Sequence, residues 1–106
     1  MAKFTLGRTP QNDIVIDDPS ISREHAFITL VSDQEILIED RDSTYGTFIN
    51  NREIKSGHSK PFDDLKFGRK EISAAEIFEH VRTITNLSRT DFNEEFKNLE
   101  IRFVEY

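Results

Sequence analysis

Three short segments decide the fold and the chemistry of this chain: Gly7-Arg8, Ser22-Arg23-Glu24-His25-Ala26 and Asp42-Ser43-Thr44-Tyr45-Gly46-Thr47-Phe48-Ile49-Asn50. They place an arginine, two hydroxyl groups and a turn in three separate loops, each next to a strand-like run. Such a set can converge on one anion, because a phosphate monoester is bound by a guanidinium that grips two oxygens, by hydroxyl donors and by backbone N–H groups exposed at turns. The spacing therefore predicts an anion-binding site that is built from loops.

The composition is that of one globular domain. The 106 residues include nine Phe to furnish a core and 32% charged residues to furnish a surface, and a chain of this length buries roughly 65% of its unfolded surface. The chain has no Cys, which excludes disulfides and thiolate metal sites and fits a reducing compartment. It shows no signal peptide and no apolar run of membrane length. We therefore expect a single domain over residues 1–106 and a cytoplasmic, intracellular location.

The charge of the chain excludes one class of partner. The net charge is −6, which argues against nucleic-acid binding because that function needs a basic face to neutralise phosphates. The positive charge is instead local, since four arginines fall in the half that carries the three segments: Arg8, Arg23, Arg41 and Arg52. We expect a small basic site on an acidic body, with no nucleic-acid and no membrane partner.

The first half of the chain alternates apolar and polar residues in short runs. These runs have the period of two that half-buried strands show, and Pro, Asn, Asp and Ser between them mark turns. The runs cover Phe4–Leu6, Ile14–Ile16, Ala26–Leu30 and Ile36–Ile38. Asn50-Asn51 then separates two further short runs, and two consecutive Asn tolerate positive φ, which predicts a tight hairpin. Short strands at this spacing predict a β-sandwich.

The second half begins with another strand pair and then changes its period. Residues 65–69 and 71–72 have the pattern of strands, and Ser73 with Glu76 forms a capping box, which is typical of a helix start. Apolar residues then follow at helical spacing: Ile77, Phe78, Val81 and Ile84. This pattern predicts a helix over residues 74–85.

The chain after this helix is expected to return to the sandwich. We expect Asn86-Leu87-Ser88 to end the helix. Leu99, Ile101 and Phe103 alternate with charged residues, which predicts a closing strand over 99–105, with the helix packed on the core or the side of the sandwich. The alternative is a detachable tail that links to another domain.

The three loop segments, in this order, closely resemble the forkhead-associated (FHA) domain, a module that reads phosphothreonine. The resemblance runs from about Phe4 to Ile54, roughly half of the chain. It implies an all-β, FHA-like β-sandwich of short, mainly antiparallel strands, to which this chain adds a helical insertion in its C-terminal half. It also implies a phosphothreonine-dependent protein–protein interaction module in Ser/Thr kinase signalling, whose partner is a phosphothreonine-containing protein or peptide.

The resemblance also assigns residues that contact the phosphopeptide. Arg8, Ser22 and Thr44 match the family positions that bind phosphate, and Arg23 stands at a position that often adds a contact. Tyr45 departs from the family, which usually has Asn there to hold the peptide backbone. Tyrosine keeps one hydroxyl but loses the paired donor and acceptor of an amide. Phosphate capture is therefore expected to survive this change better than registration of the peptide backbone.

Five further matches are expected to support the site rather than touch the ligand. The resemblance implies that Gly7 permits the close turn before the arginine and that His25 buttresses the loops. The remaining matches shape the third loop and the hairpin: Gly46, Thr47 and Asn50.

Family members usually have another strand ahead of the position that Phe4 occupies. The resemblance therefore implies either that the chain is a piece of a longer protein or that another segment takes the place of that strand. Without it a sheet edge would be exposed, and soluble proteins avoid such edges because unpaired N–H and C=O groups recruit other chains. The closing strand over 99–105 is expected to cover this edge.

No catalytic, metal or cofactor site is expected. The sequence contains no nucleophile elbow and no nucleotide-binding glycine loop. Adjacent acids, such as Asp17-Asp18 and Glu39-Asp40, would point to opposite faces of a strand as solvated charges. His58, in a polar loop, and His80, on the helix, have no acidic or Cys partner at metal-ligand spacing.

One alternative function stays open. A phosphate-independent assembly or scaffold module of the same fold would use Tyr45 in a repurposed groove and the added helix as its working surface. Arg8, Ser22 and Thr44 favour the phosphate-dependent function. A comparison of a phosphothreonine peptide with its unphosphorylated twin separates the two.

Overall fold

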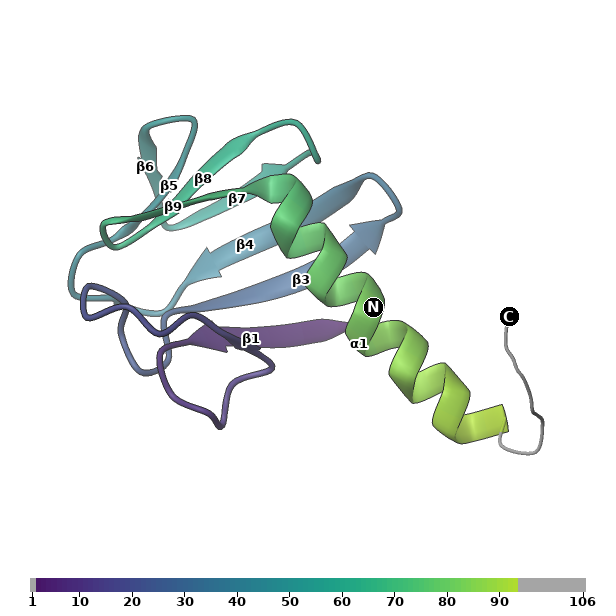
Figure 1. The fold of residues 1–106 in the computed structure, drawn as a ribbon. Helices are drawn as coiled ribbons and strands as arrows, with labels where there is room; N and C mark the ends of the chain where they lie inside the picture. The colour runs from purple at the N-terminus through teal and green to yellow at the C-terminus, as the bar shows by residue number, and fades with distance from the viewer. Residues whose placement is uncertain (1, 94–106) are drawn as a thin grey trace.

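The computed structural model describes residues 2–93, which form two β-sheets packed face to face and one helix (Figure 1). The larger sheet has the strand order β2-β1-β3-β4-β7, and the smaller one has the order β6-β5-β8-β9. The strands of the larger sheet are β1 Lys3–Gly7, β2 Ile14–Val15, β3 Ala26–Ser32, β4 Glu35–Asp40 and β7 Ser56–Ser59. Those of the smaller sheet are β5 Thr47–Ile49, β6 Arg52–Ile54, β8 Asp64–Phe67 and β9 Lys70–Ser73, and the helix is α1 Ala74–Asn93.

The core lies between the two sheets, where the alternating residues of the sequence point inward. Ile28, Ile36 and Ile38 of the larger sheet are fully buried, as is Phe67 of the smaller one, and Leu65 is nearly so. Burying one such side chain contributes roughly 1.5–3 kcal/mol relative to leaving it in water. The predicted β-sandwich and its period of two are therefore confirmed.

The strand pairing brings the three loops to one end of the sandwich. Strands β1 and β3 are antiparallel with Leu6 opposite Ala26, and β3 and β4 are antiparallel with Ala26 opposite Asp40. The end of β1, the start of β3 and the end of β4 thus lie side by side, and β5 starts from the loop that follows β4. Of the pairs in the described chain, only β1 with β2 is parallel, as the expectation of mainly antiparallel strands requires.

The predicted hairpin between β5 and β6 is confirmed. Asn50 and Asn51 have φ angles of 50° and 68°, which are left-handed values that Asn adopts more readily than most residues. The prediction for His58 is wrong in one respect, because residues 56–59 form the edge strand β7 and not a loop. Polar sequence at an edge strand is easily read as a loop, since one side of such a strand faces solvent.

The helix begins where the capping box predicted it, and it ends later. The Glu76 N–H donates to Ser73 Oγ (3.3 Å), which satisfies one of the free N–H groups of the first turn. The expectation that Asn86-Leu87-Ser88 ends the helix is wrong, since α1 continues to Asn93. Asn and Ser cost only about 0.5 kcal/mol each in a helix interior, and no Gly or Pro is present to stop it.

The helix covers the core beside the smaller sheet. It leaves β9, runs across one side of the sandwich and extends beyond the sheets (Figure 1). Its inward residues are fully buried: Ala74, Ile77, Phe78 and Val81. Within residues 2–93, β9 pairs only with β8, so its other edge carries no strand. The closing strand expected over 99–105 lies outside the described residues, and both that strand and the single domain over 1–106 stay predictions. In the described part of the chain, α1 is too polar to qualify as a membrane-crossing helix.

Candidate functional site

Gly7 allows the first loop to touch the second. The Arg8 N–H donates to the Ser22 carbonyl (3.1 Å). A Cβ atom on Gly7 would lie 2.0 Å from the Arg23 carbonyl oxygen and 2.6 Å from Asn12 Nδ2, distances at which no side chain fits. Asn12 is buried, and its amide donates to the same Arg23 carbonyl (2.7 Å). The first two loops are therefore held together by a close backbone contact and a buried amide.

The Arg8 side chain is partly buried and is held through one of its nitrogens. Its Nε donates to the Ile21 carbonyl (3.0 Å), which fixes the guanidinium beside the second loop. Among residues 2–85, no carboxylate lies within ion-pair distance of it. The two terminal nitrogens keep their N–H donors for a ligand, in the fork geometry that matches two phosphate oxygens.

Ser22 connects the second loop to the third through its hydroxyl group. The Thr44 N–H donates to Ser22 Oγ (3.1 Å), so the hydroxyl hydrogen of Ser22 stays available as a donor. Thr44 is exposed, and its own hydroxyl group supplies a second donor or acceptor. The backbone of Thr44 is thus held against the Ser22 hydroxyl group at the end of the sandwich.

His25 is fully buried and bridges the same two loops from inside. Its Nδ1 accepts from the Ser22 N–H (3.0 Å), so Nε2 carries the proton and donates to the Gly46 carbonyl (2.9 Å). The ring edge packs against Phe67 at a centroid distance of 5.8 Å. Burial lowers the pKa of His25, against the opposing effects of the Gly46 hydrogen bond and of Asp40. The neutral imidazole is therefore the form that the folded chain holds.

Asp40 organises the third loop, which makes the expectation of a solvated acid wrong. Its side chain is 1% exposed. It accepts hydrogen bonds from Ser43 Oγ (2.5 Å), the Ser43 N–H (3.1 Å) and Thr47 Oγ1 (2.6 Å). Burial alone raises the pKa of Asp40, but these hydrogen bonds outweigh it and the pKa is lowered. Ser43 Oγ also accepts from the Gly46 N–H (3.0 Å), and Gly46 has a φ of 92°. The hydrogen bonds of Asp40 and Ser43 therefore fix the conformation of the third loop.

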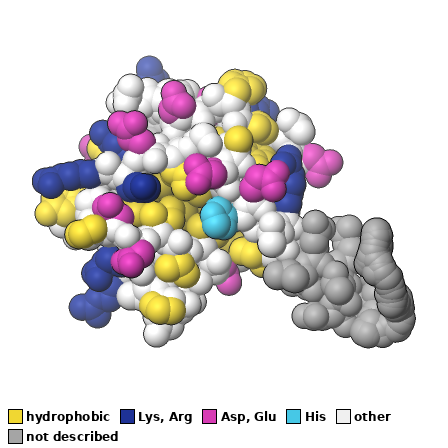
Figure 2. Space-filling model, viewed as in Figure 1, with side chains coloured by type: hydrophobic (Ala, Val, Ile, Leu, Met, Phe, Trp, Pro, Cys, Tyr) yellow, Lys and Arg dark blue, Asp and Glu magenta, His cyan; other side chains and the backbone are white. Residues whose placement is uncertain are grey.

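Only part of the predicted basic cluster lies at this end of the molecule. Arg23 is exposed in the second loop. Arg41 is instead engaged, since its Nη1 lies 2.8 Å from Glu24 Oε1 and its guanidinium lies over the Phe27 ring. Arg52 begins β6, beyond the hairpin at the far end of β5. Arg41 and Arg52 therefore do not belong to the site, although other basic side chains gather at the loop end of the molecule, at the left in Figure 2.

The β8–β9 turn adds a fourth segment that the sequence did not reveal. The Gly68 N–H donates to the Gly46 carbonyl (2.8 Å), and a Cβ on Gly68 would lie 2.2 Å from the Ser20 carbonyl oxygen. The next residue, Arg69, places its guanidinium over the Tyr45 ring, 4.8 Å from the ring centroid. Sequence reasoning missed Arg69 because this turn lies outside the three motif segments. A Gly-Arg pair after a strand, repeated from Gly7-Arg8, was the one signal available.

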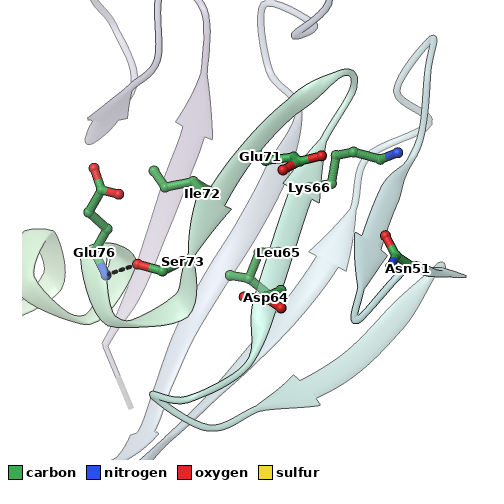
Figure 3. Close-up of a pocket in the computed structure, with 8 residues that line it drawn as sticks. All are labelled: Asn51, Asp64, Leu65, Lys66, Glu71, Ile72, Ser73 and Glu76. Carbon is green, nitrogen blue, oxygen red and sulfur yellow. Dashed lines mark hydrogen bonds between the residues drawn. The ribbon is translucent and has the colours of Figure 1, made fainter.

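A second hollow lies away from these loops, on the smaller sheet. It measures about 370 Å³ and is lined by Asn51, Asp64, Leu65, Lys66, Glu71, Ile72, Ser73 and Glu76 (Figure 3). Its carboxylates outnumber its single ammonium group, and Lys66 Nζ lies over the Phe48 ring, so this hollow does not suit a phosphate. Asn50 belongs to this far end, where its side chain bonds Asp63 Oδ1 and the Asp64 N–H. Over residues 2–85, whose side chains the structure describes, there is no cluster of three or more potential metal ligands.

Comparison with known proteins identifies the family. The FHA domain model matches residues 4–68, a range that contains all three loops and Gly68. The chain is 38% identical over 58 residues to nibrin of Danio rerio, covering 55% of this chain and 7% of nibrin. It is 33% identical over 65 residues to the glycogen accumulation regulator GarA of Mycobacterium tuberculosis, covering 61% of this chain and 40% of GarA. The chain thus spans less than half the length of both relatives.

The fold gives the same result as the sequence comparison. A solved structure described as "Structural and functional analysis of phosphothreonine-dependent FHA domain interactions" superposes with a TM-score of 0.62 at 28% sequence identity. The superposition covers 68% of this chain and 74% of that one. Both the family match and the fold therefore confirm the resemblance, and the chain belongs to the FHA family, whose domains bind phosphothreonine peptides.

Proposed function

We propose that this domain binds a phosphothreonine of a partner protein, with Arg8, Ser22 and Thr44 as the phosphate contacts. The hydrogen bond from the Thr44 N–H to Ser22 Oγ supports this most directly, because it holds the backbone of the third loop against the hydroxyl group of the second. The Arg8 N–H bonds the Ser22 carbonyl, and Arg8 Nε bonds the carbonyl of the preceding residue, Ile21, which holds the guanidinium beside the second loop. A phosphothreonine carries about −1.5 to −2 charges near pH 7 and three acceptor oxygens, which match one guanidinium and two hydroxyl donors.

The supporting residues keep these donors in place without contacting the ligand. His25 and Gly7 hold the loops against each other, while Gly46 and Thr47 shape the third loop. Asn50 shapes the hairpin at the far end. Arg23 adds an exposed positive charge next to Ser22, where it strengthens the attraction of a phosphate.

The arrangement favours binding over catalysis. A nucleophilic serine needs a base that takes its hydroxyl proton, but His25 Nδ1 accepts from the backbone N–H of Ser22 and not from its hydroxyl group. Because the ligand exists only after a Ser/Thr kinase has acted, the domain works downstream of such a kinase.

Calorimetry with matched peptides tests this function. An oriented phosphothreonine peptide library first supplies a ligand, which is then compared with its unphosphorylated twin. We expect the phosphorylated peptide to bind at least about tenfold more tightly. Arg8→Ala should remove about tenfold to a hundredfold of that affinity, since a charge-assisted hydrogen bond contributes about 1.5–3 kcal/mol. Arg8→Lys should recover only part of it, because an ammonium does not fork across two oxygens.

Arg52→Ala is the matched control for this experiment. It removes the same charge from β6, outside the site, and should leave the affinity unchanged. Thermal unfolding of each variant shows whether the fold is retained, since Arg8→Ala also removes the hydrogen bond to Ile21. Equal affinity for the phosphorylated and unphosphorylated peptides would refute the proposal and favour a phosphate-independent assembly module.

A further inference from the structure

A hollow of about 290 Å³ adjoins the three loops that carry Arg8, Ser22 and Thr44, which we call the phosphate loops. The proposed phosphate contacts do not account for this hollow. It is lined by Asp18, Pro19, Ser20, Tyr45 and Arg69. Three segments that are distant in sequence build it: the loop before Ser22, the third loop and the β8–β9 turn. The close contacts of Gly68 with Gly46 and with Ser20 hold these segments together, so the shape of the hollow is fixed by backbone.

Arg69 is held at this hollow by its backbone and by an aromatic ring. Its N–H donates to Ser20 Oγ (2.8 Å), and its guanidinium lies over the Tyr45 ring. A guanidinium over an aromatic face is attracted by the ring quadrupole. The ring occupies one face of the guanidinium and leaves the N–H donors at its edge free for a planar, bidentate acceptor. In the part of the chain whose side chains the structure describes, residues 2–85, no carboxylate lies within ion-pair distance of Arg69.

Asp18 is the second charged group at the hollow, and its carboxylate already has partners. Ser20 Oγ and the Ser20 N–H both donate to Asp18 Oδ2, at 2.5 and 3.0 Å. These two hydrogen bonds lower the pKa of Asp18, and the positive charge of Lys70 lowers it further. The Asp18 carboxylate therefore stays ionised, but its Oδ2 is already engaged by Ser20 and the nearby charge of Lys70 is opposite to its own, whereas the edge donors of the Arg69 guanidinium have no such partner among residues 2–85. The hollow accordingly suits a ligand carboxylate better than a ligand ammonium.

We propose that Arg69, oriented by Tyr45, binds the carboxylate of an Asp or Glu side chain in the same phosphopeptide, a few residues from the phosphothreonine. This inference rests on the proposed function, because it requires a peptide that the phosphate loops hold. Thr44 and Tyr45 are neighbours in one loop, and an extended peptide advances about 3.3 Å per residue, so a short segment passes from one to the other. Arg69 selects among partner sequences, and Tyr45 is the positioning residue that keeps its guanidinium at the hollow.

A glutamate scan of a phosphopeptide tests this selection. The probe is a phosphothreonine peptide with alanine at every flanking position, into which Glu, Gln or Lys is placed at one position at a time. Affinities are measured by fluorescence anisotropy for the wild type, Arg69→Gln, Arg69→Lys and Tyr45→Ala. In the wild type, one flanking position should favour Glu over Gln by about threefold to tenfold, the range expected for a partly exposed, charge-assisted pair.

The variants attribute this preference to Arg69. The Glu-to-Gln ratio should fall to about one in Arg69→Gln and to an intermediate value in Arg69→Lys and Tyr45→Ala. Arg52→Gln removes the same charge from β6 and should keep the wild-type ratio. A wild-type ratio in Arg69→Gln, the absence of any preferred position, or a preference for Lys would each overturn the inference. The proposed function fails separately, if the alanine-flanked peptide binds wild type equally well with and without its phosphate.

Discussion

Gly7→Ala tests whether the direct contact between the first two loops holds the site together. The new methyl group would lie 2.0 Å from the Arg23 carbonyl oxygen and 2.6 Å from Asn12 Nδ2. The nearer atom belongs to the backbone, so rotation of a side chain does not relieve the clash. The second loop must move away from the end of β1, and the hydrogen bond from Asn12 to Arg23 is lost with it.

The size of the effect follows from these two losses. Forcing a methylene-sized group into a packed site costs about 1–3 kcal/mol, and the hydrogen bond contributes about 1 kcal/mol. Gly7→Ala should therefore lower the free energy of unfolding by about 2–4 kcal/mol, out of a total of about 5–15 kcal/mol for a domain of this size. Because Arg8 and Ser22 lie on the two separated loops, the affinity for a phosphothreonine peptide should fall about tenfold as well.

Urea unfolding and calorimetry measure both quantities, with Gly57→Ala as the matched control. A Cβ on Gly57 would lie 3.1 Å from Ile49 Cδ1, the movable tip of a side chain. Replacing a strand glycine also restricts the unfolded chain, which stabilises by about 0.4–1 kcal/mol, so Gly57→Ala should stay within about 1 kcal/mol of the wild type. If Gly7→Ala is as stable as this control and binds the peptide normally, the argument from loop contact is wrong.

Two further predictions concern the buried histidine and the helix. Burial lowers the pKa of His25, so the unfolded chain binds the proton first as the pH falls below about 6.5. Urea unfolding of the wild type should therefore show a loss of stability from pH 7 towards pH 5. This loss should be smaller in His25→Gln but unchanged in His80→Gln, because the His80 side chain is exposed. If stability falls equally with pH in all three proteins, the prediction for His25 is wrong. Val81→Ala should lower the free energy of unfolding by about 2 kcal/mol, because this side chain of α1 is fully buried. The control His80→Ala should change the free energy of unfolding by less than about 0.5 kcal/mol. Unchanged stability in Val81→Ala would show that the helix is not part of the core.

Much of the fold could be predicted because its signals are local. The period of two in the apolar runs located the strands, since the side chains of a strand alternate between core and solvent. The Asn50-Asn51 pair predicted a hairpin, and both residues have the left-handed φ values that such a turn requires. Ser73 and Glu76 predicted the start of α1 for a similar reason, because a cap bonds backbone only three residues away.

Predictions went wrong where a residue's environment depends on distant segments. Asp40 looked like a surface acid, but the folding of the third loop over it buries the side chain among Ser43 and Thr47. His58 stood in a polar run that resembled a loop, yet pairing with β4 makes it a strand residue. The end of α1 was misplaced because Asn86-Leu87-Ser88 weakens a helix without stopping it.

The sequence by itself determined the family, the period of the strands and the residue types that suit a phosphate, because these depend on short motifs and on chain geometry. The tertiary structure alone decided which of these residues meet. Gly7 meets Arg23, and Gly68 meets Ser20 across almost fifty residues of chain, and both contacts exclude a Cβ atom. It also decided which arginine has which partner: Arg41 pairs with Glu24, whereas Arg69 stacks on Tyr45 beside the phosphate loops. The physical reason is that the partner of a charged side chain is set by strand order and loop packing, which no local pattern of residues specifies.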